Sequence, residues 1–238
     1  MNRIDKVLKQ NIESGKTSLM THVVAGYPSV EVTHELVLLM VEAGVDMIEI
    51  QIPFSDPLGD GPTIHRANTA ALQNGFRMAQ AFELVERLRK DGVEIPLLFM
   101  TYLNIAYNYG LENFCTDAKK CGVDGLIVPD YRVEAESRDG LMQRAKNHEL
   151  HLIPFATLAS SDEHLAVIAQ QKNGFVYCFS RQGVTGTTNE MYDDVSVEMS
   201  RIKETVDMPV ALGFGISNQR HVEQLKDGAD MLVVGSVI

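Results

Sequence analysis

Several residue types that would indicate other classes of protein are scarce in this chain of 238 residues. Tryptophan is absent, and the three cysteines form no Cys-x-x-Cys pair, which is typical of a reduced protein without a disulfide or zinc framework. The net charge of −11 and the lack of a Lys/Arg cluster argue against nucleic-acid binding. No apolar run approaches the roughly 20 residues of a membrane span. The polar N-terminus has no signal core, so we expect a cytoplasmic protein that binds neither nucleic acid nor membrane.

What the chain does contain is a regular alternation of short apolar runs and longer helical patterns. The apolar runs predict eight strands, near Ser18–Val24, Met47–Ile52, Pro96–Thr101, Gly125–Val128, His151–Phe155, Phe175–Phe179, Val210–Gly213 and Met231–Val234. The helical patterns lie near Ser29–Ala43, Pro62–Gln73, Ala79–Lys90, Leu111–Cys121, Val133–His148, Asp162–Gln171, Asp193–Thr205 and Asn218–Lys226. Strict alternation indicates a parallel sheet, and eight repeats predict an α/β fold, a closed (β/α)8 TIM barrel that forms a single domain over residues 1–238. A doubly wound open sheet is the alternative.

Three helix-to-strand turns share one layout, in which a glycine ends the helix and an aspartate precedes the strand. The aspartates are Asp46, Asp124 and Asp230. In a barrel, such turns lie at the N-terminal ends of the strands, which serve stability, whereas catalysis takes place at the C-terminal ends. We therefore expect structural roles for these aspartates and for His151, and we look for chemistry at the other end.

Two carboxylates follow the second predicted strand. Alternation places Glu49 on the same face as Met47 and Gln51, pointing into the barrel. A carboxylate in such a place is costly unless it is paired or used. Asp60 follows in a loop rich in Gly and Pro, where an aspartate alone is most often a turn residue. Together the two predict an acid/base pair at the mouth of the barrel, and the alternative for Glu49 is a structural polar pair.

Glycine-rich loops follow the sixth, seventh and eighth predicted strands, at residues 183–186, 213–215 and 235–236. Backbone amides in such loops commonly hold a phosphate group. No lysine lies in a predicted strand, which argues against a Schiff-base aldolase. The scattered histidines argue against a His-based metal site. We expect carboxylate-driven proton chemistry on a phosphorylated substrate, without a metal or cofactor.

These motifs together resemble the alpha subunit family of tryptophan synthase. Residues 53–63 resemble the most specific signature of that family. Further stretches match in the same order as far as the last strand, at residues 100–104, 125–130, 180–186, 213–217 and 234–236. The resemblance implies cleavage of indole-3-glycerol phosphate to indole and glyceraldehyde 3-phosphate without a cofactor in this chain. It also implies that Glu49 is the acid/base and that Asp60 binds the indole N–H.

The resemblance further implies a set of substrate-binding positions. Phosphate would contact Gly183, Gly213, Gly235 and Ser236. Tyr177 would lie near Glu49. Tyr102 and Thr185 would belong to the pocket and to its closing loop, and His22 would lie near the indole. Four residues depart from the family pattern, which usually has an apolar residue at His22, glycine at Gln51 and alanine at Gly59, and more often has proline at Arg132. The family also continues into a final helix after the eighth strand, so that helix is expected to be missing from this chain.

Members of this family dock on a beta subunit that carries pyridoxal phosphate. The resemblance therefore implies an alpha2beta2 complex with that partner, and a docking surface at residues 53–57 and 102–104. Two other functions are compatible with the sequence. One is a related phosphate-binding barrel with an altered substrate, and the other is a non-catalytic barrel that activates a beta subunit.

Overall fold

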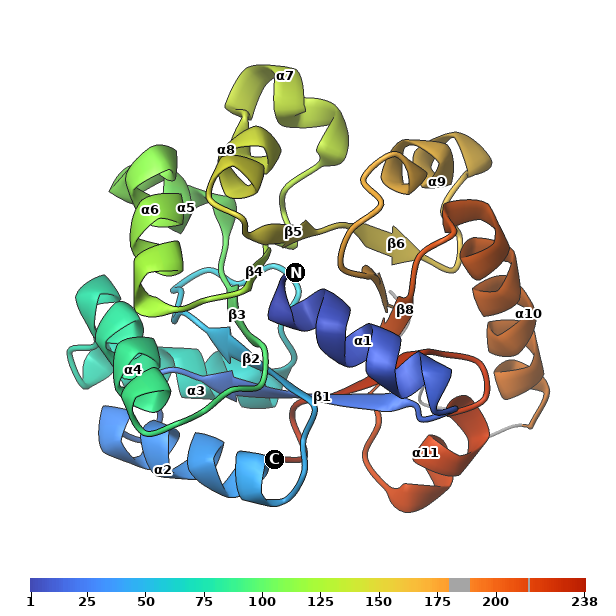
Figure 1. Ribbon diagram of the computed structural model, residues 1–238. Helices are drawn as coiled ribbons and strands as arrows, with labels where there is room; N and C mark the ends of the chain where they lie inside the picture. The colour runs from blue at the N-terminus through green and yellow to red at the C-terminus, as the bar shows by residue number, and fades with distance from the viewer. Residues whose placement is uncertain (180–188, 214) are drawn as a thin grey trace.

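The described strands form one parallel sheet that is rolled into a nearly closed barrel (Figure 1). The computed structural model describes residues 1–179, 189–213 and 215–238. The strand order is β5-β4-β3-β2-β1-β9-β8-β7-β6, and every pairing is parallel. The predicted TIM barrel is therefore confirmed. The strands are β1 (Ser18–Val24), β2 (Met47–Gln51), β3 (Leu97–Met100), β4 (Gly125–Ile127), β5 (His151–Ile153), β6 (Phe155–Thr157), β7 (Val176–Phe179), β8 (Val210–Gly213) and β9 (Met231–Val234).

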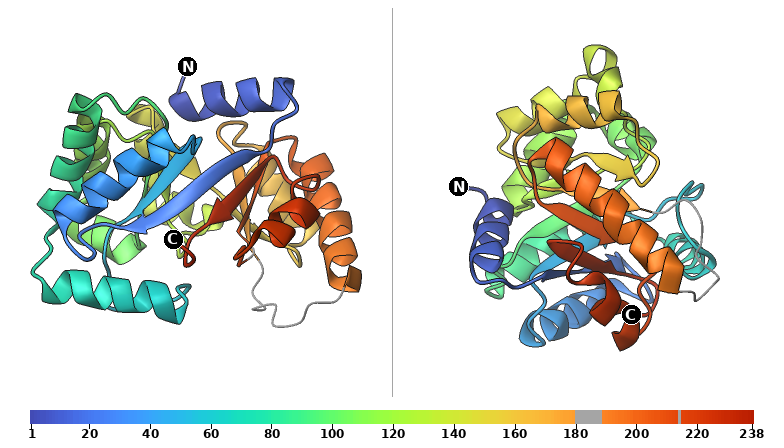
Figure 2. Two further views of the ribbon diagram at one scale, coloured as in Figure 1. Left: turned by 90° about the horizontal axis from the view of Figure 1, so that it is seen from below. Right: turned by 90° about the vertical axis from the view of Figure 1, so that its right-hand side faces the viewer.

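Helices surround this barrel and also lie across its two ends. Figure 2 (left) shows α1 across one end and α3 at the opposite end. The helices are α1 (Arg3–Glu13), α2 (Val30–Glu42), α3 (Pro62–Gln73), α4 (Met78–Lys90), α5 (Leu103–Tyr109), α6 (Leu111–Cys121), η1 (Val133–Ala135), α7 (Glu136–Asp139), α8 (Leu141–Asn147), α9 (Asp162–Ala169), α10 (Asn189–Val206) and α11 (Gln219–Leu225). No helix in the described part of the chain is long and apolar enough to cross a membrane.

The predicted fifth strand is divided in two by Pro154. β5 pairs with β4, and β6 pairs with β7. Proline has no N–H to donate to a strand ladder, although its carbonyl accepts a hydrogen bond from the Tyr177 N–H at 2.9 Å. Because β5 and β6 follow each other directly in the chain, a single residue joins the two ends of the sheet. The barrel thus closes at Pro154.

Two helices, α1 and α5, were not predicted from the sequence, and one predicted helix is broken. α1 places Ile4 and Leu8 in the apolar cluster that fills the barrel interior. Its fit depends on Gly125 of β4, where a Cβ would lie 2.9 Å from Ile4 Cδ1. The helix expected at residues 133–148 consists of η1, α7 and α8, and it is interrupted at Gly140, whose φ is +66°. A left-handed residue cannot continue an α-helix, so the chain turns there.

β2 separates the barrel interior from the helix layer as its alternation predicts. Met47 belongs to the interior cluster, whereas Ile48 and Ile50 pack in the outer cluster against the helices. Glu49 therefore points into the barrel, as expected, and is only 3% exposed.

The three repeated aspartates tie the N-terminal ends of neighbouring strands together. Asp46 accepts a hydrogen bond from the Leu19 N–H at 2.9 Å, Asp124 from the Leu97 N–H at 3.0 Å, and Asp230 from the Val210 N–H at 2.9 Å. Each also forms an ion pair with a Lys or Arg side chain. These contacts agree with the structural role expected for the three aspartates. His151, at the same end, contacts Asp5 at 2.8 Å.

Replacing Asp124 tests the importance of these turns. Asp124 is 4% exposed and accepts hydrogen bonds from Arg89 at 2.6 Å and Arg3 at 3.1 Å. Asp124→Asn leaves a partly buried guanidinium without its counter-charge, and we expect a loss of about 3 kcal/mol in the free energy of unfolding. Urea denaturation measures this loss. The exposed Asp227→Asn is the control and should change stability by less than about 0.5 kcal/mol. Equal stability of the two variants would contradict the assignment.

Candidate active site

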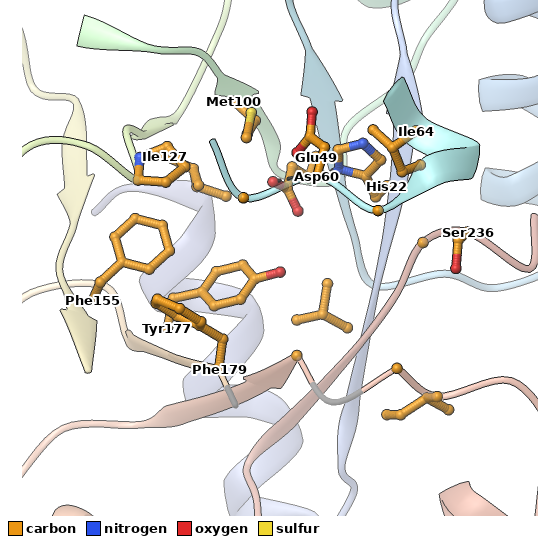
Figure 3. Close-up of a pocket in the computed structure, with 18 of the residues that line it drawn as sticks. His22, Glu49, Asp60, Ile64, Met100, Ile127, Phe155, Tyr177, Phe179 and Ser236 are labelled. Carbon is orange, nitrogen blue, oxygen red and sulfur yellow. Dashed lines mark ion pairs between the residues drawn. The ribbon is translucent and has the colours of Figure 1, made fainter. Parts of the chain in front are cut away.

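A cavity of about 330 Å³ opens at the C-terminal ends of the strands (Figure 3). It brings together eight of the residues predicted from the sequence: His22, Glu49, Asp60, Tyr102, Tyr177, Gly213, Gly235 and Ser236. Gly183 and Thr185, which were predicted with them, lie outside the described residues. Apolar side chains line much of the remaining wall: Ile64, Met100, Ile127, Phe155, Phe179, Ile216 and Val233. The cavity therefore combines a small acidic centre with an apolar surface.

The acidic centre begins with a buried pair between β1 and β2. His22 and Glu49 are register partners on these adjacent parallel strands, so both side chains point into the barrel. His22 Nδ1 lies 3.4 Å from Glu49 Oε1, and both side chains are at least nine-tenths buried. Burial alone lowers the pKa of His22, but the nearby carboxylates of Glu49 and Asp60 outweigh it and raise that pKa above its ordinary value. His22 is thus held in its protonated form to higher pH than a free histidine.

Among the described residues, neutral donors rather than a cation fix Asp60. Gln51 Nε2 donates to its Oδ2 at 2.6 Å, Asn68 Nδ2 to the same oxygen at 3.0 Å, and the Tyr102 hydroxyl to Oδ1 at 3.3 Å. Asn68 also accepts the Phe54 N–H at 3.1 Å, which ties the loop to α3. The sequence analysis did not identify Asn68. Its only signal was a polar side chain in the α3 segment, eight positions after Asp60.

Two tyrosines complete the polar part of the cavity. Burial, together with the charges of Glu49 and Asp60, raises the pKa of Tyr177 well above its usual value. The pKa of Tyr102 is raised as well, chiefly by burial. Both phenols therefore stay neutral and can donate hydrogen bonds at physiological pH. In Figure 3, Tyr177 lies with Phe155 and Phe179 on the wall across from His22 and Glu49.

Among the described glycines of the rim, Gly213 is required by close packing. A Cβ on Gly213 would lie 2.8 Å from Tyr177 Cε1, which is too close for any side chain. A Cβ on Gly235 would lie 3.5 Å from His22 Cβ, an ordinary contact. Gly215 has a φ of +62°, which favours glycine. Gly213 was expected only to let a phosphate approach the backbone, and the structure adds that it makes room for Tyr177.

Three buried polar atoms around the cavity have no hydrogen-bond partner among the described residues: Glu49 Oε2, His22 Nε2 and Gln51 Oε1. An unpaired buried polar group costs about 1–3 kcal/mol, and such groups are concentrated at functional sites. A ligand with polar atoms would satisfy them. The residues described by the structure contain no cluster of three or more His, Cys, Asp or Glu that could hold a metal ion.

The fold and this cavity define a TIM-barrel protein with one buried and one half-buried carboxylate at the C-terminal ends of its strands. A sequence model of the family "Tryptophan synthase alpha chain" matches residues 8–238. The chain belongs to the tryptophan synthase alpha chain family.

Relatives of known name and structure agree with this assignment. The tryptophan synthase alpha chains of Caldanaerobacter subterraneus subsp. tengcongensis and Thermoanaerobacter sp. are 40% and 38% identical over the whole of this chain and 89% of their own length. The crystal structure of tryptophan synthase subunit alpha from Legionella pneumophila superposes with a TM-score of 0.92 at 32% identity, over 100% of this chain and 87% of that one. A chain of the tryptophan synthase complex from Pyrococcus furiosus gives a TM-score of 0.82 at 36% identity, over 93% of this chain and 88% of that one.

Asn68 is expected to hold the Asp60 loop in place. Asn68→Ala removes the acceptor of the Phe54 N–H and a donor to Asp60, and both sites are buried or half-buried. We expect a loss of about 1–3 kcal/mol in the free energy of unfolding and faster hydrogen exchange of the Phe54 amide. Thr69→Ala, on the exposed side of the same helix, is the matched control. Unchanged exchange at Phe54 would show that the loop does not depend on Asn68.

Proposed function

We propose that this cavity cleaves indole-3-glycerol phosphate to indole and glyceraldehyde 3-phosphate, with Glu49 as the general acid and base. One observation carries the proposal: two carboxylates, on β2 and on the loop that follows it, line one partly apolar cavity whose rim is formed by glycines after β8 and β9. The family supports the same reaction. An apolar wall suits the flat indole ring, and the glycine rim suits the phosphate.

Glu49 would perform both proton transfers of the reaction. It would donate a proton to indole C3, so that the bond from C3 to the glycerol phosphate chain can break with its electrons returning to the ring. It would also accept the proton of the hydroxyl on the adjacent side-chain carbon, which becomes the aldehyde. The two transfers balance, since one proton is given and one is recovered. General acid–base catalysis by one carboxylate requires no cofactor in this chain.

Asp60 would bind the indole N–H and stabilise positive charge on the ring. Its hydrogen bonds from Gln51, Asn68 and Tyr102 are those that a carboxylate accepts. A fixed negative charge beside the developing positive charge lowers the activation barrier, because the groups of the site do not have to reorient during the reaction. The phosphate would contact Gly213, Gly235 and Ser236, together with Gly183 outside the described residues. Thr185, also outside them, would contact the substrate.

A beta subunit of tryptophan synthase is the proposed partner, in an alpha2beta2 complex, and pyridoxal phosphate would belong to that subunit. The docking surface would include residues 53–57 and 102–104. Leu58, directly after the first segment, is 84% exposed, and Tyr107 is 65% exposed. Large exposed apolar side chains beside such a loop are typical of a protein interface. A cytoplasmic location is part of the same proposal.

Loss of the Glu49 carboxylate tests the chemistry. We expect Glu49→Gln to lower kcat for indole release by roughly 10²-fold or more, the usual scale for a general acid or base. The exposed Glu83→Gln on α4 is the control and should keep the normal rate. The assay is run with the isolated chain and with a beta subunit present. Near-normal kcat in Glu49→Gln would refute the assignment. An inactive parent chain that still stimulated a beta subunit would indicate a non-catalytic partner instead.

Crowding at Gly213 tests how the substrate is seated. In Gly213→Ala the new methyl group lies 2.8 Å from Tyr177 Cε1, so the ring must move and change the shape of the cavity. Overpacking of this kind costs about 1–3 kcal/mol, and we expect KM for indole-3-glycerol phosphate to rise about tenfold. Gly59→Ala is the matched control, because its Cβ would meet Tyr102 Oη only at 3.9 Å. Equal KM values in the two variants would show that Gly213 does not contribute to substrate binding.

A further inference from the structure

We propose that His22 is a positioning residue that shares one proton with Glu49, and that the pair, rather than Glu49 alone, supplies and recovers the proton of the cleavage. This inference rests on the proposed role of Glu49 as acid and base. It assigns a role to His22, which lines the same cavity as Glu49.

The geometry of the two side chains supports a shared proton. His22 and Glu49 are Cα partners in the β1–β2 ladder, so neither can turn away without breaking the alternation of its strand. The distance from Nδ1 to Oε1 is 3.4 Å, with side-chain exposures of 10% and 4%. Catalytic hydrogen bonds are often long without substrate and tighten when it binds. A Cβ placed on Gly235 would lie 3.5 Å from the His22 Cβ, so the rim of the cavity runs close to His22 on that side.

The charges around the cavity make this proton necessary. The groups that face His22 are Glu49 from β2, Asp60 from the following loop, Tyr177 from β7 and Tyr102 from the end of β3. Two of these four are acids, and the two tyrosines are neutral. Among the described residues that line the cavity, His22 is the one side chain that can carry a positive charge near neutral pH. Two carboxylates facing one buried cavity repel each other, and a proton on His22 offsets part of that repulsion.

One proton can serve both steps if it moves within the pair. When it is on His22 Nδ1, Glu49 is a carboxylate and can accept the proton of the substrate hydroxyl. When it is on Glu49 Oε1, Glu49 is the acid that donates to indole C3, and His22 is neutral. The hydroxyl proton then restores the proton that C3 has taken, so the pair ends as it began. His22 touches no reacting atom in this scheme and acts through Glu49.

The direct test is an NMR pH titration of the His22 imidazole in the folded chain without substrate. We expect the pKa of His22 to fall in Glu49→Gln, and to fall less in Asp60→Asn, because Glu49 is its ion-pair partner. His34 is an internal reference: its Nε2 lies 2.7 Å from Asp91 Oδ2, away from the cavity. Unchanged His34 resonances show that each variant is folded. A His22 titration that is the same in the parent and in Glu49→Gln overturns the inference.

Kinetics provide a second and separate readout. The proton on His22 is lost as pH rises through the raised pKa of that residue, so kcat of the parent chain should fall on this alkaline side. His22→Phe fills the same space with an apolar ring. We expect it to lower kcat at neutral pH by roughly tenfold, less than the ~10²-fold scale for Glu49 itself, and to move that alkaline fall to a different pH, because Glu49 alone then holds the proton, with little change in KM. An unaltered pH profile in His22→Phe overturns the inference, whereas full activity of Glu49→Gln overturns the proposed function.

Discussion

The burial of Glu49 beside His22 is the interaction on which the site depends. A carboxylate that is 3% exposed at the mouth of a barrel needs a partner, because an isolated buried charge is expensive. The β1–β2 register supplies that partner from the next strand. The pairing is incomplete, however, since Glu49 Oε2 and His22 Nε2 have no partner within the described residues. The fold therefore supports a polar centre that a ligand can complete.

The carboxylates at the two ends of the barrel have different kinds of partner. At the N-terminal end, Asp46, Asp124 and Asp230 each accept a backbone N–H and pair with a lysine or arginine. Those charges are fully compensated and hold strands together. At the C-terminal end, Glu49 pairs with His22, whose pKa the nearby carboxylates raise, and the donors to Asp60 among the described residues are neutral. Stability and chemistry are thus separated along the barrel axis, as in other barrels of this class.

The alternation of strands and helices made most of the fold predictable. The pattern also picked out the two acids and the glycine loops, whereas the other site residues were implied by the family resemblance. Period-two patterns gave β1, β8 and β9 with their observed bounds and oriented Glu49 into the barrel. The break at Pro154 was missed because this proline lies within an apolar run, and the apolar pattern does not show that one backbone N–H is absent from the strand. α1 was missed because its sequence is polar apart from a few well-spaced apolar residues. Its place depends on distant contacts, such as that between Ile4 and the glycine in β4.

Contacts between strands and loops could not be read from local patterns. The pairing of His22 with Glu49 follows only from the parallel register, and the bonds to Asp60 follow from where the loop meets α3. These contacts are also what distinguishes the two acids. Glu49 lies next to a group that can give and take a proton, whereas Asp60 receives hydrogen bonds from Gln51, Asn68 and Tyr102. Environments that differ in this way assign different roles to chemically similar carboxylates. In the proposed function, a mobile proton belongs beside Glu49, and a fixed negative charge belongs at Asp60.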